Sequence, residues 1–180
     1  HADVTGWRTT GWRTIVERNG GGRFIDGGIH YVDIMVALGG MPENLYALTE
    51  SPKVLPDHEG EDGIIVMARL PNNVTGLIHY SGGTSVPKHY NWVQVAGTRG
   101  TLGFDPSGEE IALYTREGKS ITHIGPGRRG VRGMVKEFQD CIAEGREPVM
   151  SGQEAIRDLA VVLAAYKSAQ QGIPIELSPS

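Results

Sequence analysis

The apolar pattern in the middle of the chain has a period of two, from Leu45 to about Ile124, and it limits the possible folds most strongly. The even-numbered side chains of residues 63–70 are all apolar, which gives a strand one apolar face. The next three residues, Pro71-Asn72-Asn73, favour a tight turn, because asparagine tolerates a positive φ. The pattern returns in residues 74–80, so we predict an antiparallel hairpin, which shorter strands between glycines extend as far as Ile124.

Helical patterns flank this strand region on both sides. Apolar positions three and four residues apart predict a short helix that ends at Gly39-Gly40, and a second helix over about 131–144. Ser151-Gly-Gln-Glu154 is a capping box, and we expect it to open a longer, well buried helix that ends at Gly172. Strands grouped between helices predict an α+β fold, in which an open, mainly antiparallel sheet has helices packed on one face.

Composition and charge exclude several classes of protein. The 180 residues carry 17 Lys and Arg against 21 Asp and Glu, a net charge of −4, which argues against a nucleic-acid binder. One cysteine allows neither an internal disulfide nor a Cys-rich zinc module. The longest apolar run, residues 159–166, is too short for a membrane span, and the polar first residues do not resemble a signal peptide. We therefore expect a single cytoplasmic domain over residues 1–180. Because the chain starts at His1 without an initiator methionine, we expect it to be a fragment.

The segment Asp26-Gly-Gly-Ile-His30-Tyr-Val-Asp33 carries the clearest chemical signal. On a helix, Asp26, His30 and Asp33 lie on one face, because they are four and seven positions apart. A histidine between carboxylates is favoured in its protonated form and can move a proton near neutral pH. Two alternatives stay open. Asp26 is a helix cap beside a solvated Asp33, or the three side chains ligate a divalent metal ion.

Three further patterns give weaker signals. Gly125-Pro-Gly-Arg-Arg-Gly130 matches G-x-G-x-x-G, but the helix predicted after it leads to another helix instead of the strand that a dinucleotide site needs. Trp12 and Arg13 can contact an anionic substrate, or cover the edge of the core and stay in solvent. His89 and Tyr90 lie near a predicted strand end, where loops often contribute to binding sites.

Several stretches in sequence order resemble the Gfo/Idh/MocA oxidoreductase family. They cover the chain from about Gly11 onward and are residues 20–33 with Leu38-Gly39-Gly40, residues 93–102, residues 138–149 and residues 151–169. The resemblance implies the C-terminal α/β domain of the family, which shapes the substrate pocket and commonly mediates oligomerisation through the exposed face of its sheet. The N-terminal Rossmann domain, with its glycine-rich turn and a catalytic lysine, is absent from this chain.

This resemblance also implies a function. The family contains NAD(P)-dependent dehydrogenases of sugars, inositols and related polyols, so NAD or NADP is expected to bind mainly to the absent domain, and this chain alone is expected to be inactive. The catalytic pair would be Asp26 and His30, with His30 accepting the hydroxyl proton and Asp26 orienting the imidazole or binding the substrate. No metal site and no cofactor-binding residue are expected here. The expected partners are a small sugar or polyol, the Rossmann domain and further copies of the chain, without nucleic acid or membrane. The substrate-binding candidates are Trp12, Arg13, Asp33, His89 and Tyr90.

Two alternative functions stay open at this point. One is a non-catalytic binding or assembly module that kept the sheet but not the reaction. The other is a metal-dependent hydrolase that uses Asp26, His30 and Asp33.

Overall fold

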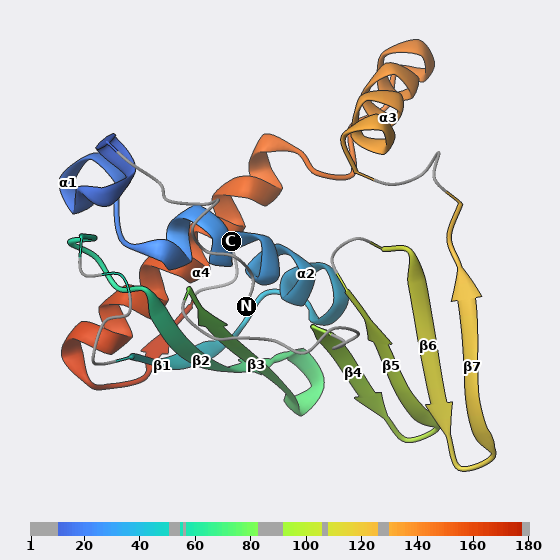
Figure 1. Ribbon diagram of the computed structural model, residues 1–180, viewed down its shortest axis with the longest axis horizontal. Helices are drawn as coiled ribbons and strands as arrows, with labels where there is room; N and C mark the ends of the chain where they lie inside the picture. The colour runs from blue at the N-terminus through green and yellow to red at the C-terminus, as the bar shows by residue number, and fades with distance from the viewer. Residues whose placement is uncertain are drawn as a thin grey trace. The chain divides into compact units, whose positions relative to one another are not determined.

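The computed structural model describes residues 11–50, 55, 57–82, 92–105, 108–125 and 130–177 (Figure 1). The chain divides into two compact units, His1–Ser85 with Met150–Ser180, and Val86–Val149. The helical elements are η2 (Gly11–Thr14), α1 (Val16–Asn19), η3 (Phe24–Gly28), α2 (Ile29–Gly39), η4 (Pro71–Asn73), α3 (Gly130–Glu144) and α4 (Gly152–Gln171). The strands are β1 (Asn44–Thr49), β2 (Gly63–Leu70), β3 (Val74–Ser81), β4 (Val93–Gly97), β5 (Gly100–Phe104), β6 (Glu110–Thr115), β7 (Gly118–His123) and β8 (Ile175–Glu176).

The first unit contains an antiparallel sheet in the order β3-β2-β1-β8. The predicted hairpin is confirmed, with Gly63 paired to Ser81 at its open end and Leu70 paired to Val74 next to the turn. Both asparagines of that turn adopt a positive φ, 60° at Asn72 and 61° at Asn73. Local turn chemistry therefore sets the register of the two longest strands.

The core of the first unit lies between this sheet and two helices. Figure 1 shows α2 and α4 on the same side of the β1–β3 sheet. Apolar side chains from the sheet and from both helices are fully buried, among them Val32 on α2, Val66 on β2 and Val161 on α4. The predicted cap of α4 is confirmed, because the Ser151 hydroxyl accepts a hydrogen bond from the Glu154 amide, and Gly172 ends the helix in a left-handed conformation.

The expectation that α4 is buried on several sides is wrong. Ile156 is 64% exposed and Leu163 is 50% exposed, whereas Val161 and Ala165 are fully buried. Apolar periodicity shows that a helix has an apolar surface, but it does not show that every part of that surface meets a partner.

The second unit contains the predicted meander. Strands β4 to β7 form an antiparallel sheet in chain order, and tight turns connect β4 to β5 and β6 to β7. The structure therefore confirms the α+β class and the antiparallel pairing. In the described part of the chain, the strands belong to two separate hydrogen-bonded sheets.

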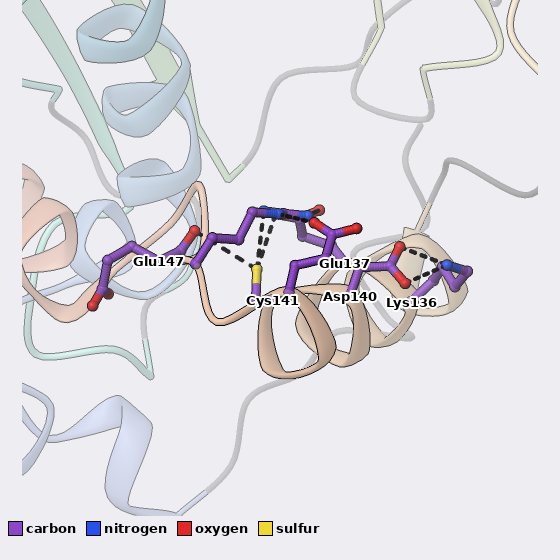
Figure 2. A network of polar contacts seen from close by, with 7 residues as sticks. Lys136, Glu137, Asp140, Cys141 and Glu147 are labelled. Carbon is purple, nitrogen blue, oxygen red and sulfur yellow. Dashed lines mark hydrogen bonds and ion pairs between the residues drawn. The ribbon is translucent and has the colours of Figure 1, made fainter.

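Polar contacts tie the C-terminal end of α3 to the turn that follows it (Figure 2). Arg146 Nη1 donates to Glu137 Oε1 at 2.8 Å, and Arg146 Nε donates to Glu144 Oε2 at 2.7 Å. The buried Cys141 thiol donates to Glu137 Oε1 at 3.4 Å. Burial and this hydrogen bond raise the pKa of the Cys141 thiol, so the only cysteine of the chain is poorly suited to act as a nucleophile.

Candidate active site around Asp26 and His30

The predicted Asp26–His30 segment lies near the start of a helix that runs from η3 into α2. Asp26 is in η3, a π-helical turn, and His30 is in the first turn of α2 with an exposed side chain. Single π-helical turns at the start or inside of α-helices are frequent at functional sites. Val32, on the same helix, is fully buried, so its side of the helix faces the hydrophobic core.

Two arginines bind the carboxylate of Asp26. Arg23 Nη1 donates to Asp26 Oδ2 at 2.7 Å, and Arg13 Nε lies 3.4 Å from Asp26 Oδ1. The guanidinium carbon of Arg13 lies 4.9 Å above the ring of Trp12, which is 51% exposed. The structure thus brings two of the predicted residues on η2, Trp12 and Arg13, together with Asp26 on η3. Among the described residues no hydrogen bond joins Asp26 to His30, so the orienting role of Asp26 stays a prediction.

Asp33 lies one turn after His30 and interacts with acidic side chains of α4. Burial raises the pKa of Asp33, the charge of His30 lowers it, and the charge of Glu154 raises it. The same cluster includes Asp158 on α4, which is only 3% exposed. Burial and the negative charges of Asp33 and Glu154 raise the pKa of Asp158 to about 6. Asp33 therefore belongs to the helix–helix contact of α2 and α4, and its contact with substrate stays a prediction.

The buried Asp158 gives a testable pH dependence. A raised pKa means that the folded chain binds the proton more tightly than the unfolded chain, so this group stabilises the fold below its ordinary pKa of 3.8 and that contribution is lost as the pH rises through about 6. We expect Asp158→Asn to raise the free energy of unfolding by about 2–3 kcal/mol near pH 7.5 and to leave it nearly unchanged near pH 3.5, below the ordinary pKa. Urea titrations at the two pH values measure this difference, with Asp57→Asn as an exposed control. An equal effect at both pH values contradicts the assignment.

Two residues of this region, Tyr80 and His58, are not among the predicted site residues. Tyr80, at the end of β3, places its hydroxyl against the backbone of Gly27, where a Cβ would come within 2.3 Å of it. Burial raises the pKa of Tyr80, which the nearby Arg23 lowers and Asp26 raises. His58, between β1 and β2, is 8% exposed; burial and the charge of Arg23 lower its pKa. Both residues come from segments remote in sequence, so only the fold brings them to Asp26.

Other expectations concern residues outside the described ranges, a metal site and a membrane span. His89 and Tyr90 lie outside the described residues, as do the four positions 126–129 of the G-x-G-x-x-G match. No group of three or more His, Cys, Asp or Glu side chains within the described ranges is arranged to hold a metal ion. No helix in those ranges is long and apolar enough to cross a membrane.

The described residues also do not fit the phosphate-binding part of a nicotinamide cofactor. Helix α3 leads directly to α4, without the second parallel strand on which a dinucleotide-binding unit depends. That no cofactor-binding residue lies in this chain stays a prediction.

Comparisons with known proteins connect this chain to a family. Residues 1–177 match a family model of the Gfo/Idh/MocA proteins. This model describes the oxidoreductase family, C-terminal alpha/beta domain. D-apiose dehydrogenase of Rhizobium rhizogenes is 26% identical over 174 residues, which are 87% of this chain and 50% of that protein. The chain spans about half the length of the curated relatives it matches.

Solved structures share the fold. Aldose-aldose oxidoreductase of Caulobacter crescentus, complexed with glycerol, superposes with a TM-score of 0.80 at 22% identity over 93% of this chain and 51% of that chain. Levoglucosan dehydrogenase in complex with NADH has a TM-score of 0.77 at 16% identity over 96% of this chain and 55% of that chain.

Proposed function

We propose that this chain, which belongs to the Gfo/Idh/MocA oxidoreductase family as its C-terminal α/β domain, forms the substrate-facing half of an NAD(P)-dependent dehydrogenase of a sugar, inositol or related polyol. The observation that carries this proposal is the position of Asp26 and His30 on consecutive turns of one helix, beside the exposed Trp12 and Arg13. Relatives named D-apiose dehydrogenase and levoglucosan dehydrogenase support a carbohydrate substrate, and the complex of the latter with NADH supports a nicotinamide cofactor.

The chemistry that we assign to these residues is the transfer of a proton. Oxidation of a secondary alcohol requires a base to accept the hydroxyl proton while the carbon gives up a hydride, and hydride chemistry belongs to the cofactor. His30 is exposed, so a ring nitrogen of His30 can reach a substrate hydroxyl and accept this proton. Protonated His30 returns it to the product oxygen when the reaction runs as a reduction.

The remaining groups bind and orient the substrate. Asp26 is held in place by Arg13 and Arg23, and its carboxylate can accept a hydrogen bond from a substrate hydroxyl. Trp12 presents an aromatic face beside these polar groups, and such a face packs against the C–H side of a sugar ring.

The proposal is tested on the natively expressed protein. Its intact mass is measured first, and we expect about twice the 19.4 kDa of this chain, since the proposed enzyme needs a cofactor-binding half. Reduction of NAD⁺ and NADP⁺ is then followed by absorbance with a panel of aldoses, inositols and linear polyols. Turnover with at least one of them supports the proposal. A native mass of one chain, together with no turnover, contradicts it and favours a binding or assembly module.

We further propose that a second copy of the chain covers the outer face of the first sheet. This face carries exposed apolar side chains from three adjacent strands, such as Leu48 (52% exposed), Met67 (53%) and Leu77 (68%). A contiguous apolar surface of this kind is costly in water and marks an interface.

The interface makes a direct prediction about mass. We expect the chain to be a dimer or larger oligomer by light scattering, and the double variant Met67→Lys/Leu77→Lys to be a monomer, because two ammonium groups would be buried without partners. Gln170→Lys/Gln171→Lys adds the same charges on the exposed end of α4 and is expected to keep the wild-type mass. An unchanged mass for the Met67/Leu77 variant contradicts the proposed interface.

A further inference from the structure

The helix that carries Asp26 and His30 begins without a cap of its own. Its first four amide groups, those of residues 22–25, lie before the first intrahelical hydrogen bond and need other acceptors. A local serine, threonine, aspartate or asparagine usually supplies one. Here Gly22 has no side chain, and Arg23 makes no side-chain capping bond.

Two residues from distant segments accept hydrogen bonds from all four amides. The Tyr166 hydroxyl on α4 accepts from Gly22 N at 3.2 Å and from Ile25 N at 3.0 Å. Glu61, which precedes β2, accepts from Arg23 N through its backbone carbonyl at 2.8 Å. The same residue accepts from the amide of Phe24 through Oε1, also at 2.8 Å. An acidic side chain at this end of a helix is also favoured by the helix dipole.

The two acceptors are joined to each other. Tyr166 Oη donates to Glu61 Oε1 at 2.9 Å, so the hydroxyl uses its proton and both lone pairs within one network. The ring of Tyr166 packs edge-on against Phe24, with 6.2 Å between ring centroids. Burial and the charge of Glu61 raise the pKa of Tyr166, which keeps the hydroxyl protonated as the network requires.

Glycines make this close approach possible. A Cβ on Gly21 would lie 2.5 Å from the Tyr166 ring, and a Cβ on Gly60 would lie 2.3 Å from the Cα of Gly22. The glycine run before the helix is therefore needed so that η3, the segment before β2 and α4 can meet.

We infer that Tyr166 and Glu61 are positioning residues of the Asp26–His30 site: together they cap the helix from two remote segments and set where its first turn places Asp26. This inference rests on the proposed function for its catalytic meaning. The amide of Ile25, which bonds to Tyr166, is adjacent to Asp26 in the chain. A displacement of about 1 Å in a catalytic group can reduce a rate by about 100-fold, so loss of the cap is expected to affect kcat.

Matched variants separate the hydroxyl and the carboxylate from the packing around them. Tyr166→Phe keeps the ring against Phe24 and removes only the hydroxyl, and Tyr114→Phe on β6 makes the same change in the second unit. Glu61→Gln keeps an acceptor oxygen for the amide of Phe24, whereas Glu61→Ala removes it. Amide hydrogen exchange and the ring signals of His30 are measured by NMR on the chain, and kcat and KM are measured on the natively expressed protein.

We expect Tyr166→Phe to speed hydrogen exchange of the Gly22 and Ile25 amides at least about tenfold and to shift the His30 ring signals. We expect kcat to fall about tenfold, while KM changes less than about threefold. Glu61→Ala is expected to speed exchange of the Phe24 amide and to lower kcat in the same way. Glu61→Gln, which keeps an acceptor oxygen, is expected to retain most of the wild-type protection and kcat. Tyr114→Phe is expected to leave exchange and kcat unchanged.

Several results would overturn the inference. Unchanged exchange at Gly22 and Ile25 in Tyr166→Phe shows that the hydroxyl does not cap the helix. Faster exchange with unchanged His30 signals and unchanged kcat shows that the cap does not position the site. If the wild-type protein has no nicotinamide-dependent turnover, the proposed function fails, and the exchange data with the His30 signals alone decide whether the two residues position the turn.

Discussion

Replacement of His30 by alanine is expected to lower kcat of the natively expressed protein by about 10²–10⁴-fold, the usual contribution of a positioned acid or base. His30 is the group that we assign to accept the hydroxyl proton, and it lies exposed one turn after Asp26, so its removal leaves no base at that point of the helix. The interaction is made with the transferring proton in the transition state, so KM is expected to change by less than about threefold. Initial rates of nicotinamide reduction on the best substrate of the panel measure both constants.

The matched control is another exposed histidine. His123 on β7, in the second unit, is paired with Glu110 at 3.3 Å. His123→Ala is expected to keep kcat within about twofold of the wild-type value. Equal losses in the two variants, or a wild-type kcat in His30→Ala, contradict the assigned role. Thermal unfolding of both variants shows whether a loss reflects folding instead.

Gly22→Ala is expected to destabilise the first unit by about 3 kcal/mol, although it adds a single methyl group. A Cβ on Gly22 would lie 2.2 Å from both the carbonyl oxygen and Oε2 of Glu61. One of these contacts is with backbone, so the segment around Gly22 must move away from the segment around Glu61. The hydrogen bonds that the amides of Arg23 and Phe24 donate to Glu61 are then weakened or lost. Urea unfolding followed by far-ultraviolet circular dichroism measures the change.

Gly152→Ala is the control for this experiment. Gly152 lies at the start of α4, and nothing lies within 4 Å of the position where its Cβ would stand. Alanine also restricts the unfolded chain more than glycine, so a stabilisation of about 0.4–1 kcal/mol is expected. If Gly22→Ala is as harmless as Gly152→Ala, Glu61 does not approach Gly22 as described.

The sequence predicted those parts of the fold that depend on neighbouring residues. Pro71-Asn72-Asn73 forms the turn of the β2–β3 hairpin because asparagine tolerates a positive φ, and Ser151 caps α4 because its hydroxyl reaches an amide three residues later. Asp26 and His30 lie near each other for the same local reason, since four residues span about one helical turn.

The parts that were missed depend on contacts between remote segments. Glu61 is 37 residues away from Phe24 and Tyr166 is 141 residues away from Ile25, so no spacing rule connects them. The glycines at 21 and 22 are explained only by close contacts with Tyr166 and Glu61, which no local pattern indicates. Ile156 on α4 is exposed although it belongs to the apolar pattern of the helix. Such a pattern does not show which surface each apolar side chain will contact.

Chemical rescue of His30→Ala tests the central claim most directly, because it returns only the proton-accepting group. Free imidazole fits the space that the alanine leaves and can accept the same proton. We predict that kcat of His30→Ala rises at least about tenfold with the concentration of neutral imidazole, and that His123→Ala and the wild-type protein show no such increase. A rate for His30→Ala that stays low and independent of imidazole, in a variant that folds as the wild type does, would contradict a proton-transfer role for His30.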